Sequence, residues 1–160
     1  MKKLIVLFAL FSSFAFAQNF NYKSYEVLLK KYVSDKGNVN YDELNRNKAE
    51  LNVVVAQFEK NSVKKNWSKN EKMAYYINTY NVYTLKSIID NYPVKSIKDI
   101  KDVWDKKIIQ MGAEKVSLSY VENKILRKMG DPRIHFAINC ASFSCPNLSN
   151  NAYEPENLNK

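Results

Sequence analysis

Residues 68–91, SKNEKMAYYINTYNVYTLKSIIDN, decide the fold of this chain. Ser68 and Glu71 stand in an S-x-x-E arrangement, the capping box in which each side chain accepts a hydrogen bond from the other residue's backbone N–H group. The apolar residues that follow cover a wide face of a helix over 71–91, so we predict that this helix is central and buried. Tyr92-Pro93 ends it, because proline disfavours helical backbone at the preceding residue. The apolar set is Met73, Tyr76, Ile77, Tyr80, Val82, Tyr83, Leu85, Ile88 and Ile89.

Two more helices are predicted before this one. Residues 22–33 carry apolar side chains at helical spacing. After a turn at 35–38, Asn40 stands three residues before Glu43 and is suited to cap a helix over 41–59.

The elements predicted after the central helix are shorter. Ser119 and Glu122 form a second S-x-x-E box, which begins a helix that ends near Gly130. The β-branched and aromatic residues of 134–139 favour a strand. The other predicted elements are a helix over 96–103 and a hairpin of 108–111 and 116–118 closed by 112–115. The fold class is therefore α+β, a helical N-terminal part packed on a small antiparallel sheet.

The ends of the chain predict export and truncation. Residues 1–17 read as a secretory signal peptide, with Lys2-Lys3, an apolar stretch and the cleavage site Ala15-Phe16-Ala17. We therefore predict a secreted or periplasmic protein, with one domain over 18–160 and no transmembrane segment after cleavage. Pro155 suits the first turn of a helix, but the chain stops at Lys160. We therefore expect that the chain is cut inside an element.

Composition excludes several functions. The formal net charge is +9, which falls to +7 when Lys2 and Lys3 leave with the signal peptide. The lysines are scattered and only three residues are arginine, unlike the clustered basic face of a nucleic-acid-binding protein. With only three glycines, the chain has no Gly-rich phosphate loop. We predict no cofactor and no nucleic-acid partner, and composition and charge identify no other partner.

Three residues capable of specific chemistry lie in one window of eleven: His135, Cys140 and Cys145. The cysteines of an exported protein commonly form a disulfide. Alternatively, Cys140 is a nucleophile with His135 as its base, although positions five apart on a flat strand face opposite sides of the sheet. A third alternative is metal ligation by all three residues, but structural zinc prefers four ligands.

Polar residues elsewhere allow two interpretations each. Asn78 and Asn81 lie three apart on the buried helix and must be hydrogen-bonded, so they either tie neighbouring loops in place or line a polar cleft. Glu122 is either the capping partner of Ser119 or a carboxylate that orients His135.

Five ordered motifs across residues 22–158 resemble those of the domain of unknown function 547 family. The central helix, residues 70–81, resembles that family's "EKLAFWINAYN" helix, and 92–97 its "YPVKSI" turn. Residues 131–146, with Cys140 and Cys145, are similar to its "DPRIHFAL.CAS..CP" signature. The remaining matches are 37–41 and 117–127.

The sequence departs from the family pattern in three places. Tyr76 replaces a tryptophan and Asn123 replaces a frequent second histidine. Family members also continue beyond the segment 152–158, in agreement with the expected truncation.

The resemblance implies a thiol hydrolase, because the family's Cys/His/Glu pattern is similar to that of papain-like and transglutaminase-like enzymes. It assigns Cys140 as nucleophile, His135 as base, Glu122 as the residue that orients it and Asn78 as a polar cleft residue. We therefore predict a thiol-dependent hydrolase of amide or peptide bonds, with an envelope peptide or protein as substrate. The alternative is a non-enzymatic binding or scaffold domain with a structural Cys140–Cys145 disulfide.

Overall fold

The structure is a computed structural model that describes residues 20–159. Helices dominate it and a single hairpin forms its sheet, so the predicted α+β class is confirmed. The predicted signal peptide lies outside the described residues. The elements are α1 (Lys23–Tyr32), α2 (Tyr41–Arg46), α3 (Lys48–Lys60), α4 (Lys69–Asp90), η1 (Ile97–Asp99), β1 (Ile109–Met111), β2 (Glu114–Val116), α5 (Leu118–Tyr120), η2 (Val121–Leu126), η3 (Arg127–Met129) and α6 (Ile134–Ala137).

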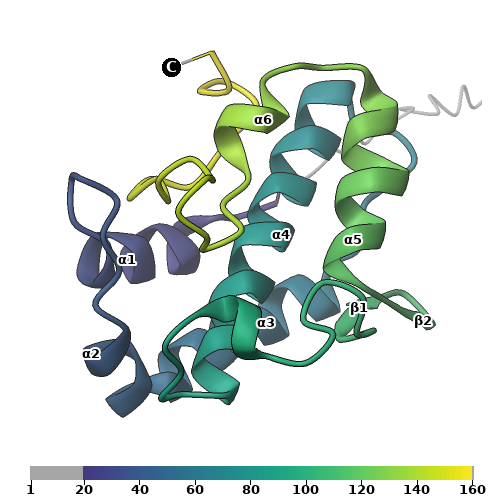
Figure 1. Cartoon of the computed structure of the whole chain (residues 1–160). Coiled ribbons are helices and arrows are strands. Elements are labelled where there is room, and N and C mark those ends of the chain that lie inside the picture. The colour runs from purple at the N-terminus through teal and green to yellow at the C-terminus, as the bar shows by residue number, and fades with distance from the viewer. Residues whose placement is uncertain (1–19, 160) are drawn as a thin grey trace, which may run out of the picture.

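The central helix α4 forms as predicted. Ser68 caps it, with its Oγ accepting from the Glu71 N–H group at 3.2 Å and its own N–H donating to Glu71 Oε2 at 2.6 Å. The helix runs through the middle of the molecule (Figure 1), and most of its residues are buried. α3 packs on one side of it and the continuous helical segment α5–η2–η3 on another. α2, α3 and the α5–η2 segment therefore pack directly against α4, whereas α1 and the hairpin pack on α3.

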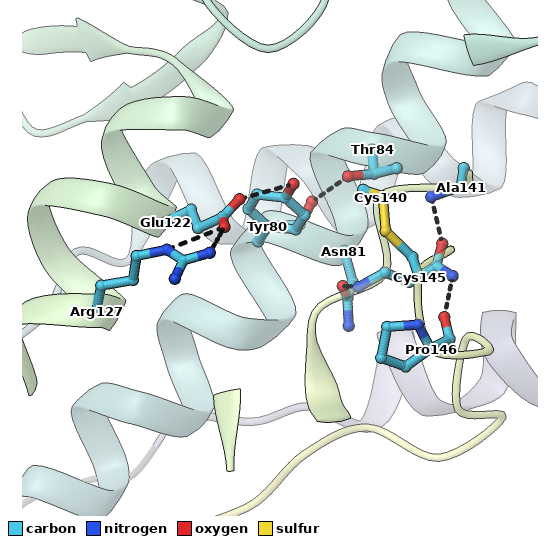
Figure 2. The surroundings of a disulfide bond; sticks show 10 residues. Tyr80, Asn81, Thr84, Glu122, Arg127, Cys140, Ala141, Cys145 and Pro146 are labelled. Atoms are coloured by element: carbon cyan, nitrogen blue, oxygen red, sulfur yellow. Dashed lines mark hydrogen bonds and ion pairs between the residues drawn. A yellow bond between two sulfur atoms is a disulfide. The ribbon is translucent and has the colours of Figure 1, made fainter. Parts of the chain in front are cut away.

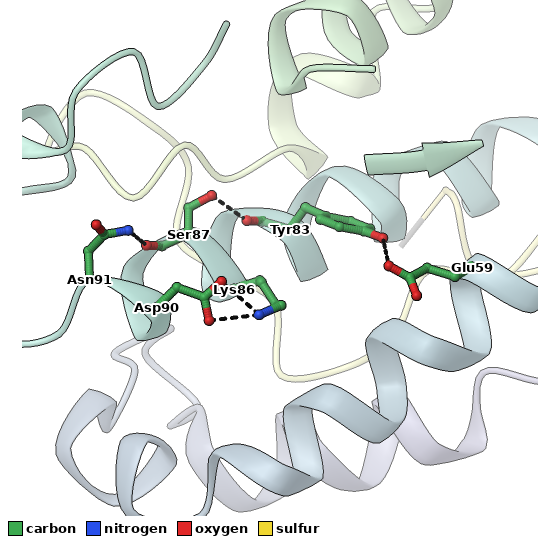
Figure 3. A network of polar contacts seen from close by, with 6 residues as sticks. All are labelled: Glu59, Tyr83, Lys86, Ser87, Asp90 and Asn91. Atoms are coloured by element: carbon green, nitrogen blue, oxygen red, sulfur yellow. Dashed lines mark hydrogen bonds and ion pairs between the residues drawn. The ribbon is translucent and has the colours of Figure 1, made fainter. Parts of the chain in front are cut away.

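Polar side chains of α4 are satisfied without disturbing this packing. Ser87 Oγ donates to the Tyr83 carbonyl at 2.8 Å, and Asn91 Nδ2 donates to the Ser87 carbonyl at 2.8 Å. Tyr83 Oη donates to Glu59 Oε1 at 3.1 Å and so connects α4 to α3 (Figure 3). A buried serine hydroxyl that donates to a carbonyl of its own helix, as Ser87 does, is thereby hydrogen-bonded within the core.

Aromatic rings fill the space between α1, α3 and α4. The Phe58 ring lies 4.6 Å from that of Phe20 and 5.4 Å from that of Tyr75. Tyr75 Oη donates to the Phe58 carbonyl at 3.0 Å. No helix within 20–159 is both long and apolar enough to cross a membrane.

Several predicted boundaries are wrong. The helix expected over 41–59 breaks at Asn47, whose side-chain amide donates to the Glu43 carbonyl at 3.0 Å and ends α2. Asn40 caps α2 as predicted. The helix expected over 96–103 is only η1, and the hairpin turns at Gly112-Ala113 with Ile109 opposite Val116.

The second predicted capping box is also wrong. Ser117 rather than Ser119 caps the helix, because its Oγ accepts from the Tyr120 N–H group at 3.1 Å. Glu122 takes no part in the cap, and its carboxylate instead accepts a hydrogen bond from Arg127.

The strand predicted over 134–139 is instead the short helix α6 followed by extended backbone from Ile138. A turn before it starts the helix: Asp131 Oδ1 accepts from the Arg133 N–H group at 3.1 Å, and the Arg133 guanidinium pairs with the Asp131 carboxylate at 2.7 Å. A strand needs a partner strand to pair its backbone groups. The only sheet within 20–159 is the β1–β2 hairpin, which lies earlier in the chain. Local turn chemistry therefore prevails over the β propensity of these residues.

This turn predicts an acid-sensitive contribution to stability. Hydrogen bonding from Arg133 lowers the pKa of Asp131 to about 2, from 3.8. A carboxyl whose folded-state pKa is lowered stabilises the fold above its unfolded pKa and loses that contribution as the pH falls through 2. We expect Asp131→Asn to cost about 1 kcal/mol in urea unfolding at pH 7.

The difference between wild type and Asp131→Asn should shrink as the pH falls towards 2 and disappear below it. Asp105→Asn is the control, because Asp105 is exposed and forms no ion pair among the described residues. An unfolding difference that stayed constant with pH would contradict this account.

Candidate functional site

A disulfide joins Cys140 to Cys145 and closes a short loop on the surface of α4 (Figure 2). The Cα atoms of the two cysteines are 5.9 Å apart. Within the loop the Cys145 N–H group donates to the Ser142 carbonyl at 2.9 Å. Ala141 has a φ of 52°, in the left-handed region. The loop is therefore closed covalently and by its own backbone.

Asn139 fixes both ends of this loop. Its Nδ2 donates to the Pro146 carbonyl at 2.6 Å, and its Oδ1 accepts from the Ala141 N–H group at 3.0 Å. The amide thus bridges the two residues that directly follow Cys140 and Cys145. Asn139 is not among the site residues predicted from the sequence, although its place directly before Cys140 is a usable signal.

Asn81 attaches the loop to α4. Its Nδ2 donates to the Ala137 carbonyl at 3.0 Å and its Oδ1 accepts from the Asn139 N–H group at 2.8 Å. Asn81 is almost completely buried. One side-chain amide therefore satisfies two backbone groups where α6 ends.

Asn78 makes the same pair of contacts with a later segment. Its Nδ2 donates to the Tyr153 carbonyl at 2.6 Å, and its Oδ1 accepts from the Tyr153 N–H group at 3.0 Å. Asn78 is completely buried. Of the two interpretations left open by the sequence, these contacts fit the tying of loops.

Glu122 is occupied by two other side chains. Its Oε1 accepts from Arg127 Nη2 at 2.7 Å and from Arg127 Nε at 3.2 Å, while Oε2 accepts from Tyr80 Oη at 3.4 Å. Burial, and then the nearby Glu122 carboxylate, raise the pKa of Tyr80. The carboxylate therefore neutralises Arg127 and anchors a buried phenol.

His135 lies on the exposed side of α6. It borders a cleft of about 340 Å³ with Arg127, Gly130, Asp131, Pro132 and Ile134. Within the described part of the chain no hydrogen bond joins its side chain to Cys140, Glu122 or Asn78. The four candidate residues are thus not assembled into one hydrogen-bonded set.

Metal ligation by His135 and the two cysteines finds no support in this geometry. Both sulfur atoms are bonded to each other. Over residues 20–159, no three His, Cys, Asp or Glu side chains gather closely enough to hold a metal ion.

Comparison with known proteins gives a family and no function. A family model described as "Protein of unknown function, DUF547" matches residues 64–160. The chain belongs to the DUF547 family. The match begins just before α4 and includes α6 and the disulfide loop, so it spans every candidate site residue. No curated protein and no solved structure matches the chain.

The two hydrogen bonds of the Asn81 side chain predict that the stability of this DUF547 protein and the order of the loop both depend on this residue. Asn81→Ala leaves a buried carbonyl at Ala137 and a half-buried N–H group at Asn139 without their side-chain partner. We expect a loss of about 2–3 kcal/mol in the free energy of unfolding, together with faster hydrogen exchange at the Asn139 amide. Urea unfolding and amide exchange by NMR measure these two effects.

Asn91→Ala is the matched control, because Asn91 makes only one such bond, to its own helix. It should cost less than about 1 kcal/mol and leave the exchange of Asn139 unchanged. Equal exchange of Asn139 in both variants would show that Asn81 does not hold the loop.

Proposed function

We propose that this DUF547 chain is a binding domain of an exported protein and that the Cys140–Cys145 loop is its recognition element. The observation that carries the proposal is Phe143, whose side chain is fully exposed between the two cysteines. Phe136 on α6 is also 78% exposed. Large apolar side chains gain most from being covered, and aromatic residues are enriched at the centres of interfaces.

The loop is held before any partner arrives. The disulfide, the Asn139 amide and the Cys145–Ser142 backbone bond all restrict it. A recognition loop that is already ordered loses less conformational entropy on binding. Burial of one phenylalanine ring contributes about 1.5–3 kcal/mol. Because the loop is already ordered, little of this free energy is offset by the entropy cost of ordering it on binding.

The chemistry around Phe143 favours an apolar, uncharged partner surface. Residues 139–151, NCASFSCPNLSNN, contain no charged side chain, although the whole chain has a formal net charge of +9. This segment offers amides and hydroxyls around one aromatic ring. A peptide or protein segment with apolar side chains and free backbone groups matches it better than an anionic polymer does.

Thiol-dependent hydrolysis is the second candidate. It is favoured by the proximity in sequence of His135 and Cys140 and by the Cys/His/Glu pattern of residues 122–145. It requires reduction of the disulfide, because only a thiolate is nucleophilic. It also requires His135 to approach Cys140, and Glu122 to exchange Arg127 for another partner.

A photoreactive phenylalanine analogue placed at position 143 tests the binding function. Expressed in a bacterium that exports the chain, the 143 variant should crosslink to one defined envelope protein. The same analogue at Val53, an exposed residue of α3, is the matched control and should not. Replacing both cysteines by serine should weaken the crosslink severalfold, since the loop is then no longer closed. Identical products from positions 143 and 53 would contradict the proposal.

Alkylation of the exported protein separates the two candidate functions. Without reductant, we expect no alkylation and an intact mass lower than that of the reduced protein by the mass of two hydrogen atoms. After reduction both cysteines should react. Rapid alkylation of Cys140 alone, at neutral pH and without reductant, would instead favour the hydrolase. In that case Cys140→Ala should abolish peptide hydrolysis while Cys145→Ala retains it.

A further inference from the structure

One pocket combines aromatic walls with carboxylates. It has a volume of about 190 Å³ and lies where the first described residues, the segment before α4 and residues 154–156 meet. It shares no residue with the disulfide loop. Its lining consists of Phe20, Tyr22, Trp67, Glu71, Glu154, Pro155 and Glu156.

The aromatic side of the pocket is ordered by packing. The Phe20 and Tyr22 ring centroids are 4.7 Å apart. The Trp67 ring lies 5.6 Å from that of Tyr75. Tyr22 and Trp67 are buried apart from their contact with the pocket. The faces of such rings carry negative electrostatic potential and attract cations.

The carboxylates lack basic partners. None of Glu71, Glu154 and Glu156 forms an ion pair with any residue between 20 and 159, in a chain with 25 basic and 16 acidic residues. Hydrogen bonding from Ser68 lowers the pKa of Glu71, so this carboxylate is ionised at neutral pH. Glu71 and Glu154 line the same pocket as the Tyr22 ring.

Trp67 adds an unused donor. Its indole N–H group is buried and has no acceptor within the described residues. A buried donor without a partner is unfavourable. Trp67 also lines the pocket, so its indole resonance reports on what the pocket holds.

We infer that this pocket binds a primary alkylammonium group, the chemistry of a lysine side chain presented by a peptide. The aromatic rings attract any organic cation, but only a primary ammonium donates three hydrogen bonds to surrounding carboxylates. The aliphatic stem of lysine packs on apolar walls while its charged end reaches polar groups. Here Phe20 and Pro155 supply such walls. The inference is independent of the disulfide loop and of its proposed partner.

NMR titration of the full chain tests this inference through the indole N–H resonance of Trp67, assigned with a Trp104→Phe variant. The probes are Nα-acetyl-lysine methylamide and 1,5-diaminopentane. Both should shift the resonance saturably, and tighter binding of the lysine derivative would identify a peptide rather than a free diamine as the source of the ammonium group. The norleucine derivative has the same stem without the charge and should bind at least about tenfold more weakly, if carboxylates and rings act together.

Matched substitutions complete the test. Glu154→Gln with Glu156→Gln removes two exposed charges and should weaken binding of the lysine derivative about tenfold. Glu114→Gln with Asp105→Asn removes the same charge from exposed positions outside the pocket and should leave it unchanged. Equal binding of the lysine and norleucine derivatives, equal effects of the two double variants, or no saturable shift with either amine would overturn the inference.

Discussion

Two buried amides on α4 hold the segments of this protein that follow α6. Beyond α6 the described chain, up to residue 159, has no helix or strand to pair its backbone groups. Asn81 takes the carbonyl and N–H groups of Ala137 and Asn139, and Asn78 takes both groups of Tyr153. Irregular backbone against a core is tolerated only when its polar groups find partners. The spacing of these asparagines, three residues along one helix face, therefore decides where the later segments can lie.

This arrangement separates a rigid support from an exposed loop. The support is α4, buried along most of its length and capped at Ser68. The loop is closed at Cys140 and Cys145, and Asn139 connects its two ends. Loops fixed on a rigid scaffold commonly carry binding residues. Each contact from Asn81 outward restricts the backbone on which Phe143 stands.

Sequence patterns predicted the parts of the fold that rest on strong local signals. The capping box at Ser68, the cap at Asn40 and the end of α4 before Pro93 follow from chemistry within a few residues. One local signal misled: the S-x-x-E arrangement of Ser119 and Glu122 predicted a cap at Ser119, whereas Ser117, with Tyr120 three residues later, caps the helix. The β propensity of residues 134–139 was outweighed by the turn at Asp131 and by the absence of a neighbouring strand within 20–159.

The candidate site was harder to predict because its residues have more than one use. A histidine, a cysteine and a glutamate in sequence order resemble a catalytic set, but each type also has a structural role. Here Glu122 is bonded to Arg127 and Tyr80, Cys140 is bonded to Cys145, and His135 is exposed on α6. Conversion to a catalytic set would require breaking the Glu122–Arg127 ion pair and the disulfide. Recognition by the loop requires none of these changes, since Phe143 is already exposed and its supports are already bonded. This difference is the reason for proposing a binding domain rather than a hydrolase.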